Sequence, residues 1–120
     1  MEKKIVKLDS AIKEIVRDGD LLIFSGMKVN RVPIAGVHEL IRQRRSSLRV
    51  MGLPNPLPTD ILCGAGSLKR VEFCYMGIQG NKGFAQMRNF RRASEQGTTE
   101  TLEEIGWITI QQIYAGALQI

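Results

Sequence analysis

The chain is organised around residues 24–33, Phe24-Ser25-Gly26-Met27-Lys28-Val29-Asn30-Arg31-Val32-Pro33. This stretch joins an apolar run, residues 21–24, to a helix that we expect Pro33 to open, because proline at the first helical position gives up only an N–H that would be unpaired there. In a parallel α/β sheet, ligands gather in the loops that follow the carboxyl ends of strands. Asn30 and Arg31 would stand there beside the positive end of the helix dipole. The stretch therefore predicts a loop that binds a carboxylate or a phosphate.

Apolar segments typical of buried strands alternate along the chain with segments of helical spacing. The predicted strands are residues 21–24, 48–53 and 71–76, followed by an edge strand over 98–104. Predicted helices separate them, and a last helix runs from about Trp107 to the end of the sequence. This alternation predicts an α/β fold with a mostly parallel, Rossmann-like sheet and helices on both faces. We expect residues 1–120 to form a single domain with an incomplete sheet.

Composition and charge narrow the class of protein. The 120 residues, 43% hydrophobic and 24% charged, suit one soluble core. No apolar run reaches the roughly 18 residues of a membrane span, and the lysine-rich start is unlike a signal peptide, so we expect a cytoplasmic protein without a membrane partner. The net charge of +5, with Arg42, Arg44, Arg45 and Arg49 close together, raises the question of nucleic acid. Because no aromatic residues interleave with these arginines to stack bases, we expect a solvated face and no nucleic-acid partner.

The sequence contains no convincing catalytic group. His38 is the only histidine, and its neighbour Glu39 points to another side of the helix, so the two form no relay. Ser25 lacks the G-x-S-x-G pattern of a nucleophile elbow. Cys63 and Cys74 are far apart in sequence and predict two buried apolar thiols, with no metal site. We therefore expect substrate-binding residues but no catalytic residue, no metal and no permanently bound cofactor.

A second glycine-rich segment, residues 77–83, follows the predicted strand 71–76. Gly77, Gly80 and Gly83 are equally spaced, but the segment fits neither the Walker pattern nor the dinucleotide pattern G-x-G-x-x-G. A flexible turn and a ligand loop both remain open. If the sheet is parallel, residues 25–32 and 77–83 should lie near the same sheet edge.

The chain resembles a known family, the A (alpha) subunits of acyl-CoA transferases of the glutaconate CoA-transferase type, in their N-terminal part. Such subunits carry a similar glycine loop followed by Asn-Arg-x-Pro, as at residues 26–33 here. The resemblance continues through residues 37–43, 64–66, 69–72, 89–93 and 115–117. Members of the family continue beyond this length, so we expect a fragment or a shortened subunit with apolar surface left for a partner.

The resemblance implies a function. In the family, the B subunit supplies a glutamate that attacks the acyl-CoA carbonyl to give an anhydride and then a glutamyl-CoA thioester, while the A subunit contacts the acid. It implies a hetero-oligomeric CoA-transferase subunit, inactive without its B subunit, with coenzyme A as cosubstrate and with acyl-CoA and a carboxylic acid as substrates. The substrate-binding residues carried over are Ser25, Gly26, Asn30, Arg31, Pro33, Gly77 and Gly80.

Two positions depart from the family pattern. Met27 stands where an aromatic residue is common, and Gly106 stands before Trp107 where many relatives have glutamate. Related ring-cleaving hydrolases use that glutamate, so its absence makes an acyl-CoA hydrolase the weaker alternative. A truncated binding or structural domain without turnover is a further alternative.

Overall fold

The structure is a computed structural model that describes residues 5–81 and 83–120. Its helices are α1 (Leu8–Ile15), α2 (Ile34–Arg42), α3 (Pro56–Gly64), α4 (Arg88–Glu95) and α5 (Gly106–Leu118). Its strands are β1 (Leu21–Leu22), β2 (Leu48–Gly52), β3 (Leu68–Phe73), β4 (Gly77–Gly80), β5 (Gly83–Gln86) and β6 (Glu100–Glu103). No helix in these described ranges has the length and apolar character that a membrane crossing needs.

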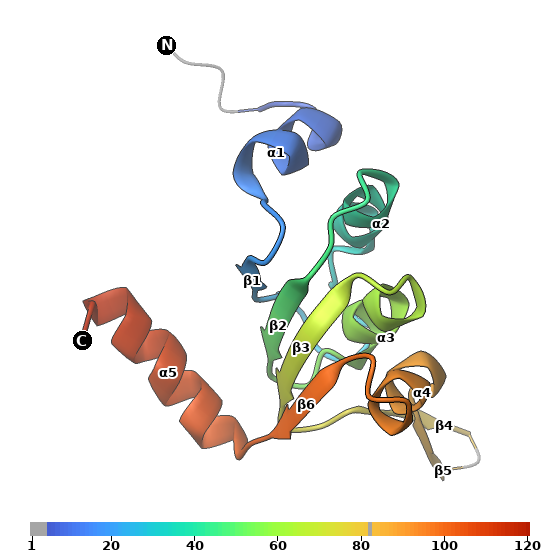
Figure 1. Ribbon diagram of the computed structural model, residues 1–120. Coiled ribbons are helices and arrows are strands. Elements are labelled where there is room, and N and C mark those ends of the chain that lie inside the picture. The colour runs from blue at the N-terminus through green and yellow to red at the C-terminus, as the bar shows by residue number, and fades with distance from the viewer. Residues whose placement is uncertain (1–4, 82) are drawn as a thin grey trace.

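The main sheet has four parallel strands in the order β1-β2-β3-β6. This confirms the predicted parallel α/β sheet. The helices are distributed unevenly over its faces, because α2, α3 and α4 all cover one face, whereas α5 lies off the other side (Figure 1). Each new strand is added on the same side of the previous one, and right-handed crossovers in a constant direction must place every connecting helix on the same face. Connecting helices on the second face would require the strand order to reverse.

The core lies between the sheet and these helices. Val50 and Val71 are paired across β2 and β3 and point toward the helices, where Val37 and Leu62 are completely buried. Burying an aliphatic side chain of this size contributes about 1.5 to 3 kcal/mol relative to leaving it exposed. This packing holds the sheet and therefore the positions of the loops at its edges.

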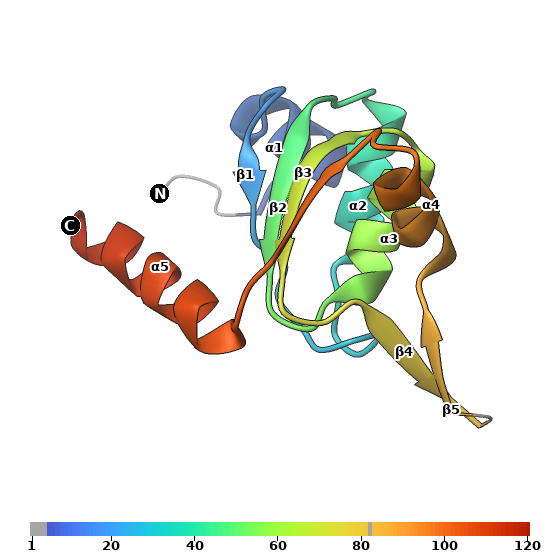
Figure 2. The ribbon, with the colours of Figure 1, turned by 60° about the horizontal axis from the view of Figure 1, so that its bottom comes forward.

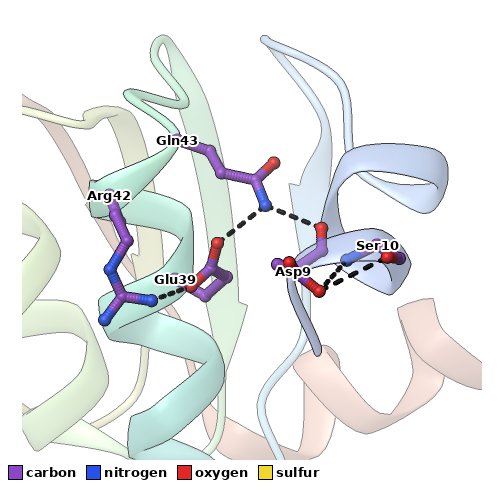
Figure 3. A network of polar contacts seen from close by, with 5 residues as sticks. All are labelled: Asp9, Ser10, Glu39, Arg42 and Gln43. Carbon is purple, nitrogen blue, oxygen red and sulfur yellow. Dashed lines mark hydrogen bonds and ion pairs between the residues drawn. The ribbon is translucent and has the colours of Figure 1, made fainter. Parts of the chain in front are cut away.

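Helix α1 is fastened to α2 by a polar network (Figure 3). The Nε2 of Gln43 donates both to Oε1 of the buried Glu39 and to the backbone carbonyl of Asp9, each at 2.8 Å. Arg42 forms an ion pair with the other oxygen of Glu39. The basic stretch that ends α2 is thus partly engaged within the fold, since Arg45 also donates to the Lys13 carbonyl at 3.3 Å.

Helix α5 stands apart from the sheet in both ribbon views (Figures 1 and 2). Its apolar side chains stay largely uncovered: Ile110 is 43% exposed and Tyr114 is 61% exposed. Trp107, in the first turn, is 67% exposed. The first turn does contact the sheet edge, because Thr109 is almost fully buried. Most of α5 therefore presents apolar surface to its surroundings.

Two sequence predictions need correction around β3. The predicted strand at residues 71–76 lies at Leu68–Phe73, because Leu68 and Val71 are the side chains that reach the core and a register shift between Leu48 and Arg49 accommodates them. Most of the described part of the segment 77–83 is strand and not loop, since Gly77–Gly80 is β4 and Gly83 begins β5. The segment starts an antiparallel hairpin in which Gly77 pairs with Gln86 and Gly80 pairs with Gly83. Lys82 lies outside the described residues.

Candidate functional site

The loops that follow the parallel strands all emerge at the end of the sheet where the carboxyl ends of the strands lie, which we call the carboxyl edge. They are residues 23–33 after β1, 53–55 after β2, 74–76 after β3 and 104–105 after β6. Figure 2 shows the loop from β1 to α2 and the hairpin β4–β5 at this same end of the sheet. The edge is where α/β sheets bind ligands. Both predicted site segments are therefore at the sheet edge expected for them.

The loop after β1 closes as a tight turn. Met27 and Asn30 exchange backbone hydrogen bonds, with N···O distances of 3.0 and 2.8 Å. Gly26 has φ +96°, and a Cβ added there would lie 2.6 Å from the carbonyl oxygens of Asn30 and Arg31. Gly26 thus permits a close backbone approach, and its partner is the loop itself.

The same loop holds two residues in an unfavourable backbone conformation. Lys28 has φ 56° and Arg31 has φ 55°, both in the left-handed region that L-residues with side chains rarely occupy. Two hydrogen bonds tie this loop to the segment after β2: the Lys28 N–H donates to the Pro54 carbonyl at 2.6 Å, and Nδ2 of Asn55 donates to the Phe24 carbonyl at 2.6 Å. Strain of this kind costs about 1 to 3 kcal/mol per residue and is concentrated at functional sites.

The polar residues predicted for this loop face solvent. Ser25, Asn30 and Arg31 are exposed, and Arg31 takes part in no ion pair within residues 5–81 and 83–120. Pro33 is the residue just before α2 rather than its first residue, since the helix begins at Ile34. The donors of Asn30 and Arg31 are consequently available to an anion beside a helix start.

Of the two glycines of the hairpin, Gly77 has a structural explanation. Gly77 is buried, and a Cβ on it would lie 2.8 Å from the Tyr75 hydroxyl and 3.3 Å from the Ala85 carbonyl. Gly80 is exposed at the far end of β4 and pairs with Gly83. The described residues that line the cavities beside these two glycines do not include the loop after β1. Their assignment to substrate binding stays a prediction from the resemblance.

Sequence reasoning missed a large cavity at the carboxyl ends of the strands. A cleft of about 820 Å³ opens between the hairpin and α4, at the carboxyl ends of β3 and β6. Its wall is aromatic, with Phe73 and Phe90 in edge-to-face contact at 5.0 Å and Tyr75 and Phe84 at 6.3 Å. These rings come from three separate parts of the sequence. In the sequence, the available signal was the set of aromatic residues on both sides of the glycine-rich segment. Only the folded hairpin shows that these residues line one cavity.

Charged side chains border this cleft. Arg91 donates to Glu95 at 2.7 Å, and this hydrogen bond followed by the charge of Glu95 raises the pKa of the Arg91 guanidinium. Glu103 lines the same cleft. A second cavity of about 530 Å³ shares the lining residues Cys74 and Glu103 with this cleft and is also lined by Glu104. Oε2 of Glu104 is buried without a hydrogen-bond partner among the described residues.

Helix α4, which carries one wall of the cleft, is positioned by Asp60 of α3. Oδ1 of Asp60 accepts the Phe90 backbone N–H at 2.9 Å, and Oδ2 accepts Nδ2 of Asn89 at 3.0 Å. Asp60 is only 9% exposed, and its charge lies at the positive end of the α4 dipole. One carboxylate thus caps the helix that supplies Phe90 and Arg91 to the cleft.

The two thiols differ. Burial, and secondarily the charge of Asp60, raises the pKa of Cys63 to about 12, so this thiol stays protonated and unreactive at neutral pH. Cys74 is only half-buried and lines both cavities, which corrects the expectation of two buried thiols. Across the described residues, histidine, cysteine and carboxylate side chains nowhere gather in threes that could hold a metal ion. His38 is exposed on α2.

Comparison with known proteins yields curated relatives of one kind. The chain is 31% identical over 100 residues to the A subunit of 3-oxoadipate CoA-transferase from Pseudomonas knackmussii, and the match covers 83% of this chain and 34% of the relative. It is 30% identical over 114 residues to the A subunit of glutaconate CoA-transferase from Acidaminococcus fermentans, covering 95% of this chain and 35% of that relative. The chain thus spans about a third of the length of these curated relatives. No protein-family model matches it.

Solved structures agree in fold. Glutaconate coenzyme A-transferase from Acidaminococcus fermentans matches with a TM-score of 0.84 and 28% identity, covering 98% of this chain and 37% of that chain. A variant of the decarboxylase AibA/AibB matches with a TM-score of 0.88 and 32% identity, covering 96% of this chain and 44% of that chain. The predicted resemblance to A subunits of the glutaconate CoA-transferase type is confirmed.

Proposed function

From the premise that this chain is related to the A subunits of CoA-transferases over about a third of their length, we propose that it belongs to a CoA-transferase A subunit. In that role it helps to transfer CoA between an acyl-CoA and a carboxylic acid. Residues 1–120 then form one α/β unit of that subunit, with coenzyme A as a cosubstrate rather than a permanent cofactor.

The observation that carries the proposal is the loop after β1. Exposed donors of Asn30 and Arg31 stand beside the start of α2, on a backbone that is strained and held in place by hydrogen bonds. Guanidinium and amide groups suit the two oxygens of a carboxylate. Because Arg31 has no ion pair in the described part of the chain, its charge is free for a substrate. We assign Ser25, Gly26, Asn30, Arg31 and Pro33 to binding of the acid.

The attacking glutamate comes, in this proposal, from a B subunit. Its carboxylate attacks the acyl-CoA carbonyl and CoA thiolate leaves, which gives a mixed anhydride; CoA then returns to form a glutamyl-CoA thioester and release the acid. The second acid accepts CoA by the reverse steps.

The described strand order never reverses, so this part of the chain has no crevice at a topological switch point, and the uncovered surface of α5 is available to a partner.

The test is co-expression of the chain with a B-type subunit, followed by affinity purification and an assay for exchange of CoA between a labelled acid and an acyl-CoA. We expect the two chains to purify together and exchange to depend on both. Turnover by this chain alone, or no exchange by the purified pair with any acid, contradicts the proposal.

A decarboxylase subunit is the second candidate, favoured by the 32% identity to the decarboxylase AibA/AibB. The same purified pair separates the two functions, because a decarboxylase releases CO₂ from its substrate without exchanging CoA. The hydrolase alternative predicts release of free CoA. A Cβ at Gly106, the position where many relatives have glutamate, would make ordinary contacts with Leu53 at 3.4 Å and Cys74 at 3.5 Å.

A further inference from the structure

We infer that the aromatic cleft between the hairpin and α4 receives the acyl group of the acid, and that this acid is a monocarboxylic acid with an apolar chain or ring rather than a dicarboxylic acid. The inference rests on the proposed function and names its substrate class. The cleft lies at the carboxyl edge of the sheet together with the loop that carries Asn30 and Arg31.

The lining of the cleft favours apolar groups. Phe73, Tyr75, Met76, Phe84 and Phe90 line it, and Phe84 is 73% exposed on the hairpin side. A volume of about 820 Å³ is within the range of small-molecule sites, which are mostly apolar with few polar groups. An alkyl chain or a ring that packs against these side chains would remove apolar surface from water, on the ligand and on the exposed Phe84 ring.

The charges argue against a second carboxylate. Among the described residues that line the cleft, Arg91 is the one cation, and it is engaged by Glu95 at 2.7 Å. Glu103 adds a further negative charge, so the lining carries one positive and two negative groups. A second carboxylate placed beside these groups would meet more negative than positive charge and no unengaged cation, which is unfavourable. Glutaconate and 3-oxoadipate, in the names of the curated relatives, are both dicarboxylates. This chain is therefore expected to differ from those relatives in substrate.

Hexanoate and adipate make a matched pair of probes, because they have the same number of carbons and differ only in a terminal methyl or carboxylate. In the complex with the B subunit, we expect kcat/KM for hexanoate to exceed that for adipate at least about tenfold. Phe84→Ala should lower kcat/KM for hexanoate severalfold. Since Phe84 is largely exposed, that variant is expected to keep its fold, which circular dichroism checks.

Freeing the arginine should change the preference. In Glu95→Gln the Arg91 guanidinium loses its ion partner, so the ratio of adipate to hexanoate turnover is expected to rise about tenfold. The double variant Glu95→Gln with Arg91→Gln should lose this gain. Glu14→Gln on α1, which is exposed, removes the same charge away from the cleft and should leave the ratio unchanged.

Each outcome has a defined meaning. A wild-type preference for adipate, or a ratio that does not move in Glu95→Gln, overturns the inference but leaves the proposed transferase function standing. Exchange with no acid at all contradicts the proposed function. In that case, calorimetric titration of the full chain with hexanoate and adipate still decides the inference, which requires hexanoate to bind more tightly and Phe84→Ala to weaken it.

Discussion

The carbonyl of Arg31 lies so close to Gly26 that a Cβ on Gly26 would be 2.6 Å from its oxygen. This contact folds the loop after β1 back on itself and sets the position of Arg31. The glycine is required both by this approach and by its φ of +96°.

Gly26→Ala is expected to disrupt the loop. The Cβ cannot be accommodated without moving the Asn30–Arg31 backbone, at a cost of about 1 to 3 kcal/mol. We expect a lower melting temperature and a loss of CoA exchange in the complex of more than about tenfold. Gly36→Ala is the matched control: it lies inside α2, a Cβ there meets nothing within 4 Å, and helix propensity predicts a gain of about 0.5 to 1 kcal/mol. Equal stability and activity of the two variants would contradict this account.

Arg31→Ala tests the contact with the acid. Because Arg31 is exposed and has no ion pair in the described residues, the melting temperature should stay nearly unchanged. Loss of a charged hydrogen bond to substrate should weaken binding or turnover by about 1.5 to 3 kcal/mol. Arg92→Ala, an exposed arginine on α4, serves as the control. Unchanged kinetics with every acid would remove the loop from the substrate site, and a large drop in stability would indicate a structural role.

Asp60→Ala should loosen α4. The buried N–H of Phe90 loses its acceptor, which costs about 1 to 3 kcal/mol. Urea denaturation measures the loss, and hydrogen exchange should show it concentrated in α4. Asp60→Asn retains one acceptor oxygen and is expected to lie between the wild type and Asp60→Ala. Uniform faster exchange across the sheet, with α4 no more affected than α2, would be inconsistent with a local cap.

Alkaline pH should destabilise the fold through Cys63. Its pKa is about 12 in the folded chain against an ordinary value of 9.0, so the folded state retains a proton that the unfolded state releases. The contribution of the protonated Cys63 thiol to the free energy of unfolding is fully present below pH 9 and is lost as the pH rises toward 12. Urea midpoints of wild type and Cys63→Ala, measured between pH 8 and pH 10.5, should converge as the pH rises. In the folded protein, a thiol reagent should modify the half-buried Cys74 before Cys63.

The sequence predicted those helices and strands that are marked by local signals. Helix α2, strand β2 and the edge strand β6 occur close to the predicted ranges because apolar periodicity and proline mark them. The hairpin β4–β5 could not be predicted in this way, since its glycines suggest a loop and the contact that explains Gly77, with the Tyr75 hydroxyl, exists only in the folded chain. The exposed loop after β1 was predicted from its polar residues.

The aromatic cleft depended on tertiary structure. Phe73 ends β3, Phe84 lies in β5 and Phe90 in α4, so only the folded chain places these rings around one cavity. The alternation of strands and helices in the sequence likewise could not predict which face of the sheet each helix covers. The covered face depends on the order in which the strands are laid down, and that order is the same from β1 to β6.

This constant strand order bears on how the chain can acquire its structure during synthesis. The paired positions Leu21 and Arg49, Arg49 and Arg70, and Arg70 and Glu100 are 28, 21 and 30 residues apart (49 − 21, 70 − 49 and 100 − 70). Each strand after β1 therefore finds its neighbour already synthesised when it leaves the ribosome, and among the described strands of this sheet none has to be inserted between two others. The sheet can grow in the direction of translation, one strand and one helix at a time.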